Sequence, residues 1–409
     1  MISDGIQERE APRALPCGNE DRPIAEVLPA RIALLTTFIS PYVFPVFHHL
    51  ASSVEHLRIF LSTPMEDDRP WEPHWGGLNV VVQKSFSRAY RYVYKKGLTT
   101  PHLRHFPYDV FPLLFRYRPD VVISGQLGFR TLQAAIFRRL VPASRLVIWA
   151  DLSEHTESQF GHSRTLFRRL LLPAADAVLV NGASGARYLQ RLGVPSDRIV
   201  LAPFSTDMSA LMSIPAARAP SAALRLLYVG QLIERKGLEI FLAALVEWSK
   251  RHPGRNCEVW FVGDGPLRKT LENFPVPASI GLRFFGNVPY EALPAYYAQV
   301  GILVLPTLWD TWALVVNEAM AAGLPIFGSV YSEAVQELVQ DGLTGWTFRP
   351  DAPDELRRAL EQALSSSAPA LDAMREAARD RIRYLTPEYS SDQFLRAICM
   401  AMRVNQRKS

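Results

Sequence analysis

Runs of apolar residues that end at turn-forming residues recur along the chain from residue 31 onward. Six lie in the first half: RIALLTT (31–37), HLRIFLS (56–62), LNVVVQK (78–84), DVVISG (120–125), RLVIWAD (145–151) and DAVLVNG (176–182). Continuous apolar runs of this length are typical of strands buried on both faces of a parallel sheet. Between the later runs, residues 131–140 and 184–193 have helical spacing. The alternation predicts βαβ units.

A second series of apolar runs follows residue 223. Its members are LRLLYVG (224–230), EVWFVG (258–263), LRFFGNV (282–288), ILVLP (302–306), PIFGS (325–329) and GWTFRP (345–350). Helical patterns separate them. We therefore expect an α/β protein with two tandem, doubly wound Rossmann-like domains facing a cleft, and ligands at the carboxyl ends of the strands.

The same pattern gives domain boundaries. Residues 208–223 are rich in Ala, Ser and Pro and have no strand signal, which indicates a linker. The predicted units are a disordered leader (1–30), an N-terminal Rossmann-like domain (31–207), the linker (208–223), a C-terminal Rossmann-like domain (224–385) and a C-terminal helix that docks back on the domains (386–409).

Composition narrows the class of protein. The 409 residues are 48% hydrophobic and 21% charged, as in folded globular chains. No stretch approaches the roughly 18 apolar residues that a membrane span needs, and the leader does not resemble a secretory signal. Cys17, Cys257 and Cys399 lie far apart, which argues against a disulfide framework or a zinc site. A cytoplasmic protein fits best.

Positive charge is concentrated in the first half. Residues 31–210 carry 21 Lys and Arg against 13 Asp and Glu, whereas residues 211–409 carry 21 of each. A surplus of this sign favours an anionic partner on the first domain.

The stretch DTWALVVNEAMAAGLPI (310–326) places two carboxylates among small apolar residues. Asp310 and Thr311 are suited to capping a helix, and Gly323 is suited to ending it. Such a helix would direct its free N–H groups at the carboxyl edge of the sheet, where they favour an anion such as a diphosphate. Glu318 would lie on the helix flank facing the cleft, where the vicinal hydroxyls of a ligand can donate to it.

The turn VGQLIERKG (229–237) combines glycines and cations between a strand and a helix. Gly230 allows close approach of a ligand, and Arg235 and Lys236 supply positive charge, so this turn is a candidate diphosphate site. In FVGDGPLRKTLE (261–272), Gly263 and Gly265 are interpreted as serving turn geometry.

In their order along the chain these segments resemble the motifs of the retaining glycosyltransferases of family 4, also called glycosyl transferases group 1, which adopt the GT-B fold. VGQLIERKG is similar to that family's VGRLxxxKG, FVGDGPLRKTLE to GxGPxxxxLE, residues 282–307 to FxGxVxxxxLxxxYxxADxxVLPS, and residues 310–326 to the E-x7-E signature. Residues 175–207 resemble the segment that ends in PNGVD.

The resemblance implies that residues 31–207 form the acceptor-side domain and residues 224–385 the nucleotide-sugar-binding domain. It also implies roles for individual residues. Glu318 would hold the ribose hydroxyls of a nucleotide-sugar, Asp310 would contact the donor sugar, and Lys236 would pair with the diphosphate and assist the leaving group. Backbone amides just after Asp310 would contact sugar and diphosphate: those of Thr311, Trp312, Ala313, Leu314 and Val315. No metal or cofactor is expected, because cations and helix N-termini can stabilise the leaving diphosphate.

Three positions depart from the family pattern. Asp310 stands where the signature has Glu, so it reaches one methylene less far. Gln231 replaces the usual Arg after Gly230, and Arg235 is a candidate substitute for the missing cation. Residues 36–47 contain prolines and no glycine where a glycine-rich turn is common.

In the first domain, RLVIWADLSEHTES (145–158) places Asp151 and His155 just after a strand end. Many members of the family have a His at that strand end, where this chain has Ala150. His155 is a candidate for that role from a displaced position, and a loop histidine without catalytic function is an equally good interpretation. Asp151 is the other catalytic candidate.

Residues 84–105 interleave cations with aromatic residues. This composition suits anionic lipid headgroups, and the FRRL repeats at 137–140 and 167–170 add to the positive charge. An ordinary solvated loop is equally compatible. The hypothesis is peripheral attachment at the inner face of the plasma membrane.

The predicted function is transfer of a sugar, with retention, from a nucleotide-sugar donor to a glycan or lipid-linked acceptor, in bacterial exopolysaccharide, capsule or lipopolysaccharide synthesis. Two alternatives stay open: a nucleotide-sugar epimerase on the same fold, and a non-catalytic binder of nucleotide-sugar or glycan. A nucleic-acid partner is not expected.

Overall fold

The structure is a computed structural model, and it describes residues 27–66, 71–93, 99–215, 218–219 and 224–403. The predicted disordered leader lies mostly outside the described residues. Its end is corrected by the structure, because the first strand begins at Leu28 rather than after residue 30.

The first domain is built on a seven-stranded parallel sheet with the order β3-β2-β1-β6-β7-β8-β9. Its strands are β1 (Leu28–Thr36), β2 (Val54–Leu61), β3 (Val80–Val82), β6 (Val121–Gly125), β7 (Arg145–Ala150), β8 (Ala177–Val180) and β9 (Ile199–Leu201). Every residue of β6 and β8 is buried, as expected where helices cover both faces of a parallel sheet.

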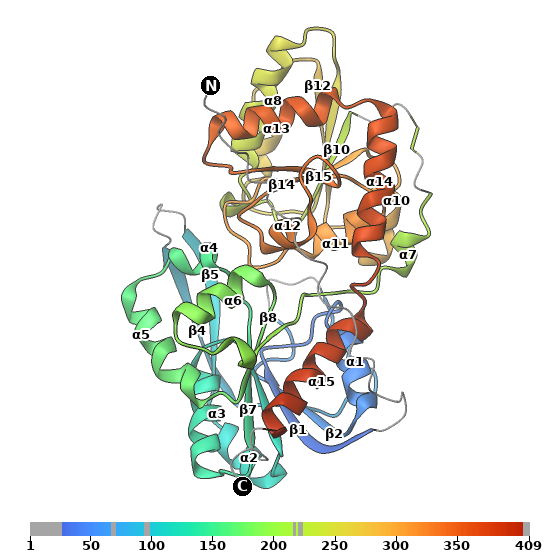
Figure 1. The fold of residues 1–409 in the computed structure, drawn as a ribbon. Helices are drawn as coiled ribbons and strands as arrows, with labels where there is room; N and C mark the ends of the chain where they lie inside the picture. Colours follow the sequence, from blue (N-terminus) through green and yellow to red (C-terminus); the bar gives the residue numbers. More distant parts are fainter. Residues whose placement is uncertain (1–26, 67–70, 94–98, 216–217, 220–223, 404–409) are drawn as a thin grey trace, which may run out of the picture.

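Two layers of helices cover this sheet (Figure 1). One hydrophobic cluster holds α2 (Val110–Tyr117), α3 (Phe129–Leu140), α5 (His162–Leu171) and α6 (Ala183–Arg191) against one face. A second cluster holds α1 (Phe44–Ser53) and α15 (Pro387–Arg403) against the other face. The last helix of the chain therefore belongs to the packing of the first sheet, through Phe394, Ile398 and Ala401 among others.

The second domain has a six-stranded parallel sheet with the order β12-β11-β10-β13-β14-β15. Its strands are β10 (Arg225–Val229), β11 (Cys257–Val262), β12 (Ile280–Gly286), β13 (Ile302–Leu305), β14 (Ile326–Ser329) and β15 (Gly345–Phe348). Its helices are α8 (Leu238–Arg251), α9 (Arg268–Glu272), α10 (Leu293–Tyr297), α11 (Leu314–Ala321), α12 (Glu333–Leu338), α13 (Pro353–Ser365) and α14 (Ala368–Ile382). The strand order reverses between β10 and β13, and parallel sheets bind ligands beside such a switch point.

Three smaller elements complete the fold. The described residues of the basic and aromatic stretch at 84–105 lie mostly in two antiparallel strands, β4 (Ser85–Val93) and β5 (Thr99–Pro107), rather than in the loop considered above; this pair of strands is called the hairpin below. The predicted linker contains the short helix α7 (Ser209–Met212), and helix α4 (Glu154–Ser158) follows β7. No helix in the described part of the chain has the length and apolar character needed to cross a bilayer.

Candidate functional site

The carboxyl edge of the second sheet is assembled by close backbone contacts between loops. Gly230 N donates to Val262 O over 2.9 Å, and Leu232 N donates to Asp264 O over 2.9 Å. A Cβ on Gly263, whose φ is +129°, would overlap the carbonyl of Gly230. Glycine is therefore needed at Gly263 for the two loops to meet, which is a backbone role.

The turn before α8 is fixed in a similar way. Gly237 has φ +67° and forms the N-terminal boundary of α8, and a Cβ there would overlap the carbonyl oxygen of Pro306. Leu308 N in turn donates to Arg235 O over 2.8 Å. The turn that carries Arg235 and Lys236 is thus joined directly to the loop between β13 and α11.

That junction brings three predicted site residues together. The ammonium of Lys236 lies 2.5 Å from Oδ2 of Asp310, and the guanidinium of Arg235 lies 3.7 Å from the same oxygen. Arg235 also donates to the carbonyl of Trp309 over 3.1 Å. Lys236 and Asp310 are 74 positions apart in sequence, and together with Arg235 they form one charged cluster at the carboxyl edge of the sheet.

The predicted start of the next helix was wrong. Helix α11 begins at Leu314, after Ala313, and no side chain caps it. Asp310 is held by Lys236, and the hydroxyl of Thr311 donates to Asp151 of the first domain over 3.1 Å. Both residues have the chemistry of N-caps, but tertiary partners hold them instead.

Other predicted donor-binding positions lie around this loop. Trp312 is buried and donates from Nε1 to Oδ1 of Asn317 over 3.1 Å. Ala313 is buried, while Leu314 and Val315 are partly exposed. The carbonyl of Gln231 accepts a hydrogen bond from the hydroxyl of Tyr228 over 2.7 Å.

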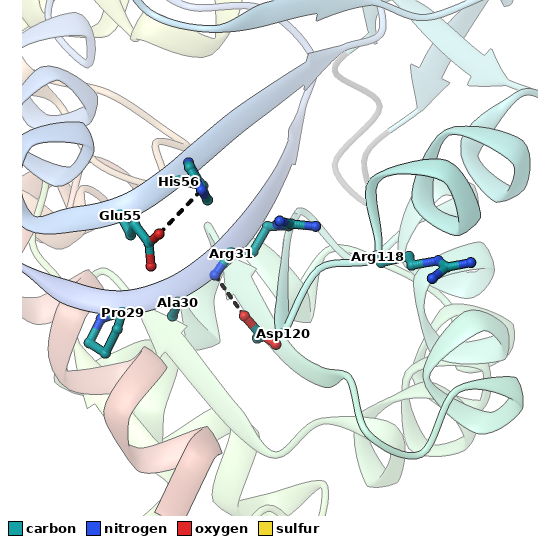
Figure 2. Close-up of a pocket in the computed structure, with 7 residues that line it drawn as sticks. All are labelled: Pro29, Ala30, Arg31, Glu55, His56, Arg118 and Asp120. Atoms are coloured by element: carbon teal, nitrogen blue, oxygen red, sulfur yellow. Dashed lines mark hydrogen bonds and ion pairs between the residues drawn. The ribbon is translucent and has the colours of Figure 1, made fainter.

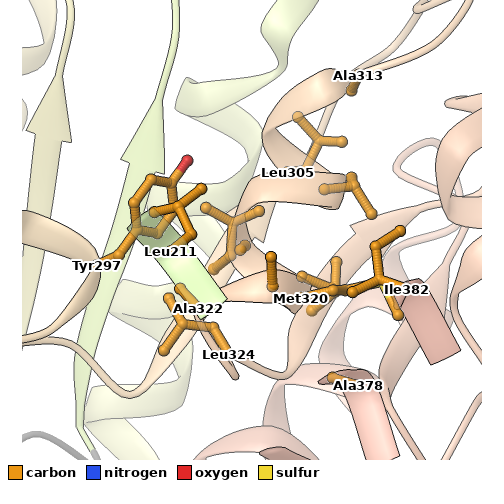
Figure 3. Packing of buried hydrophobic residues seen from close by; sticks show 14 of the residues in the cluster. Leu211, Tyr297, Leu305, Ala313, Met320, Ala322, Leu324, Ala378 and Ile382 are labelled. Carbon is orange, nitrogen blue, oxygen red and sulfur yellow. The ribbon is translucent and has the colours of Figure 1, made fainter. Parts of the chain in front are cut away.

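Glu318 is 5% exposed on α11. Its Oε2 accepts a hydrogen bond from the hydroxyl of Tyr297 over 2.8 Å, and Tyr297 packs in the apolar cluster beneath this helix (Figure 3). Burial raises the pKa of Glu318, against the opposing hydrogen bonds from Tyr297 and Tyr290. The carboxyl is therefore positioned by phenol hydroxyls, of which that of Tyr290 also bonds to Thr206 over 3.3 Å.

The first domain reaches the same loop from the opposite side. Asp151 follows β7 and accepts the hydrogen bond from Thr311. The surrounding protein raises the pKa of the Asp151 carboxyl, Asp310 and Glu157 raise it further, and the bond from Thr311 opposes the rise. Its side chain is exposed on one side, so hydration limits the shift.

His155 is an interdomain contact in this structure. Its ring stacks on Tyr331 with centroids 3.7 Å apart and planes 8° apart, and its Nε2 lies 3.0 Å from the carbonyl oxygen of Leu308. A ring nitrogen facing a carbonyl acts as a donor. In this arrangement Nε2 is therefore not the atom that would accept a proton from a substrate.

A buried polar cluster that the sequence analysis missed joins the domains. Asn181, just after β8, donates from Nδ2 to Thr311 O over 2.6 Å and to Oε2 of Glu333 over 2.9 Å. Oε1 of Glu333 accepts from Gly185 N over 2.9 Å, and Glu337 accepts from Ala183 N over 2.7 Å. Two acids on α12 thus bind the free N–H groups at the start of α6.

The sequence contains a weak indication that Asn181 and Glu333 are functional residues. Asn181 directly follows an apolar run, in VLVNG, and Glu333 closely follows another, in SVYSEA. Polar residues of these types are unusual next to buried strands. Their partners are 152 positions apart, so neither pattern alone indicates the pairing.

A separate hollow lies at the amino ends of the first strands, and Figure 2 shows the residues that line it: Pro29, Ala30, Arg31, Glu55, His56, Arg118 and Asp120. Arg31 N donates to Asp120 there over 2.7 Å. Ligands of parallel sheets bind at the opposite edge, so this hollow is not the candidate site. Within the described residues, no three His, Cys, Asp or Glu side chains are grouped to hold a metal.

Residues 215–381 match the family description "Glycosyl transferases group 1". The matched segment, which is similar to this family, lies almost wholly within the second domain. This domain contains the Lys236–Asp310 pair, Glu318, Glu333 and Tyr297, so the charged cluster and the buried acids belong to the matched part of the chain.

Curated proteins with similar sequences carry transferase names. The chain is 31% identical over 142 residues to an alpha-D-kanosaminyltransferase of Streptomyces kanamyceticus, covering 34% of this chain and 36% of that protein. It is 27% identical over 257 residues to the putative colanic acid biosynthesis glycosyltransferase WcaL of Escherichia coli, covering 60% of this chain and 56% of that protein. The chain thus matches less than two thirds of the length of these relatives.

Solved structures extend the likeness to the whole fold. The lipopolysaccharide outer core galactosyltransferase WaaB superposes with a TM-score of 0.67 at 15% identity, over 90% of this chain and 99% of WaaB. Anabaena Alr3699/HepE, in complex with UDP-glucose, superposes with a TM-score of 0.65 at 14% identity, over 90% and 99% of the two chains. The two domains together therefore have the GT-B fold.

Proposed function

We propose that this protein transfers a sugar from a nucleotide-sugar donor to a glycan or lipid-linked acceptor. The observation that carries the proposal is the convergence of Lys236 and Arg235 on Asp310, at the carboxyl edge of the sheet in the second domain. A diphosphate bound there would meet two cations already held in place, and preorganised positive charge favours the developing negative charge of a leaving diphosphate.

Asp310 gives the cluster a second property. Its carboxylate neutralises Lys236 before donor binds, so an incoming diphosphate competes with it for the ammonium. Once the diphosphate takes the lysine, the carboxylate is released to accept hydrogen bonds from sugar hydroxyls. Charge exchange of this kind would couple diphosphate binding to sugar binding in one step.

Glu318 supplies the third contact. Its pKa is raised by burial, so donors from a ligand would favour the ionised form and recover the cost of burying it. Vicinal ribose hydroxyls provide two such donors. We further propose that the sugar is transferred with retention of configuration by reaction on one face of the donor, without a protein nucleophile and without a metal.

The names of the related proteins support the substrate class. Alr3699/HepE was solved with UDP-glucose, and WcaL is named for colanic acid biosynthesis. We therefore propose uridine diphosphate sugars as the first donors to test, and bacterial surface or exported polysaccharide as the product.

The test is a thermal-shift screen of the full chain against uridine, guanosine and adenosine diphosphate sugars, because a ligand that binds the native state raises its melting temperature. One donor should stabilise the wild type, and Glu318→Gln should lose most of that shift. Exposed Glu247 on α8 provides a matched control, and Glu247→Gln should keep the shift. Equal shifts in all three proteins would remove Glu318 from the site.

Product analysis separates the alternatives. A transferase slowly releases nucleoside diphosphate and free sugar when water replaces the acceptor. An epimerase returns an altered nucleotide-sugar with the diphosphate bond intact. A protein that is stabilised by the donor but releases and alters nothing would be a binder, and either of the last two results would contradict the proposal.

A further inference from the structure

The helices on one face of the first sheet have an unusual charge pattern. None of α2, α3, α5 and α6 contains an acidic residue, although together they carry nine arginines. The corresponding helix α13 of the second domain has both signs, with Asp354 and Glu355 in its first turn. Five of these arginines pair with acids of neighbouring segments, namely Asp176, Glu157 and Glu154. The uncompensated positive charge of this helix layer therefore lies on its other exposed arginines, which include Arg139 and Arg169.

Large apolar side chains project from the same layer. On α3, Ile136 is 42% and Leu140 is 62% exposed, and on α5, Leu166 is 60% and Leu170 is 74% exposed. Both helices pack their inner sides into the same cluster under the sheet, so these four residues lie on the outward side. Exposed apolar groups gathered on adjacent helices mark a contact surface rather than random exposure.

Arginines stand between these apolar residues. Arg139 precedes Leu140 and Arg169 precedes Leu170, and both are exposed. Neither forms an ion pair with any acid among the residues that the structure describes, whereas Arg138 is engaged by Asp176 and Arg168 by Glu157. We call the outward side of α3 and α5, with Ile136, Leu140, Leu166, Leu170, Arg139 and Arg169, the α3–α5 surface.

The surface continues toward the hairpin. Phe129, at the start of α3, contacts Phe106 of β5 with ring centroids 5.7 Å apart, and Phe106 lies 6.5 Å from Phe86 of β4. Phe86 is 61% exposed. The aromatic residues of the hairpin therefore extend the same apolar band.

We propose that the α3–α5 surface docks on an anionic lipid membrane. Aliphatic side chains that protrude between arginines match the boundary between headgroups and acyl chains. A second copy of this chain is disfavoured because it would bring arginine against arginine with no acid between them. A purely polar polyanion would leave the exposed leucines without an apolar partner.

This inference rests on the proposed function in one respect, which is the assignment of the acceptor to the first domain. The surface belongs to the domain that would take the acceptor, so docking would bring a lipid-linked acceptor to the enzyme. Docking itself is independent of donor binding, because the charged cluster of Lys236 and Asp310 is in the other domain.

The test is co-sedimentation of the full chain at low salt with vesicles of phosphatidylglycerol and phosphatidylcholine, and with vesicles of phosphatidylcholine alone. We expect binding to the first only. Arg139→Glu with Arg169→Glu should weaken partitioning about tenfold or more, since each cation near an anionic surface contributes a sizeable part of the affinity. Leu166→Ser with Leu170→Ser should weaken it as well.

A matched control uses exposed residues of the second domain, Arg358→Glu with Leu343→Ser, which should bind like the wild type. The proposal is overturned if the wild type does not bind, if the control loses binding equally, or if gel filtration shows a dimer that the surface variants dissociate. The donor-induced thermal shift should persist in the surface variants, so failure of docking is distinguishable from failure of the transferase proposal.

Discussion

Asn181 of the first domain and Glu333 of the second are hydrogen-bonded to each other, with Nδ2 and Oε2 2.9 Å apart, and both side chains are fully buried. The same amide binds the carbonyl of Thr311, in the loop that would hold the donor. One side chain therefore contacts both the second domain's buried acid and the donor loop.

Replacing Asn181 by Ala should destabilise this contact. The carboxyl of Glu333 would lose one of its donors inside the protein, and a buried polar group left without its partner costs about 1–3 kcal/mol. We expect a lower melting temperature and faster limited proteolysis. Asn273 is exposed, and within the part of the chain that the structure describes its side chain bonds only to the carbonyl of Lys269 in its own helix turn. It is the matched control, and Asn273→Ala should be neutral. Identical melting of the Asn181 variant and the wild type would contradict this role.

Glu333 should make stability depend on pH. Burial raises the pKa of its carboxyl to about 8, against the opposing bond from Gly185, and Glu337 and Asp151 raise it further while Arg187 lowers it. The folded state therefore binds the proton more tightly than the unfolded state. This contribution is complete below the ordinary pKa of a glutamate and is lost as pH rises toward 8, with each pKa unit equal to about 1.4 kcal/mol.

The measurement is the melting temperature of the wild type and of Glu333→Gln from pH 5 to pH 9. The Gln side chain has no titrating group, so the wild type should lose stability relative to the variant as pH rises across this range. Parallel curves for the two proteins would show that Glu333 has the same pKa when folded and unfolded.

Lys236→Ala should affect turnover more than folding. Asp310 would keep only Arg235, at 3.7 Å, and loss of one preorganised donor from a charge-stabilising site lowers turnover by about 10²–10³-fold. Steady-state kinetics and melting temperature should be measured together, with exposed Lys269→Ala on α9 as the control. A loss of activity that merely follows a loss of stability would assign Lys236 a structural role.

Gly237→Ala should be far more destabilising than Gly254→Ala. Both glycines have positive φ, +67° and +87°, so both substitutions carry the cost of about 1 kcal/mol for the left-handed conformation. A Cβ at Gly237 also overlaps the carbonyl of Pro306, whereas nothing lies within 4 Å of a Cβ at Gly254. The difference in unfolding free energy between the two variants measures the cost of separating the two loops of the charged cluster.

Much of the architecture follows from the sequence because it depends on local patterns. Continuous apolar runs predicted twelve of the parallel strands, for example residues 31–37 in β1 and residues 302–306 in β13. The β4–β5 hairpin was missed because its residues are cationic and aromatic rather than regularly alternating, and a two-stranded ribbon gives little apolar signal.

The candidate site was only partly predictable. The grouping of Lys236 with Asp310 follows from the motif order, because loops at one edge of a parallel sheet meet. The start of α11 was misplaced because Asp310 and Thr311 prefer caps in general, yet ion pairing with Lys236 and a bond to Asp151 hold them here. Contacts between domains, such as that of Asn181 with Glu333, cannot be predicted from sequence patterns that extend over only a few helical turns.

The return of α15 to the first sheet has a practical consequence. Its apolar side covers the same sheet face as α1, so an expression fragment that stops before Pro387 would expose this face to water and invite aggregation. To produce the first domain separately in soluble form, α15 has to be fused to that domain. Alternatively, α15 can be added as a separate peptide.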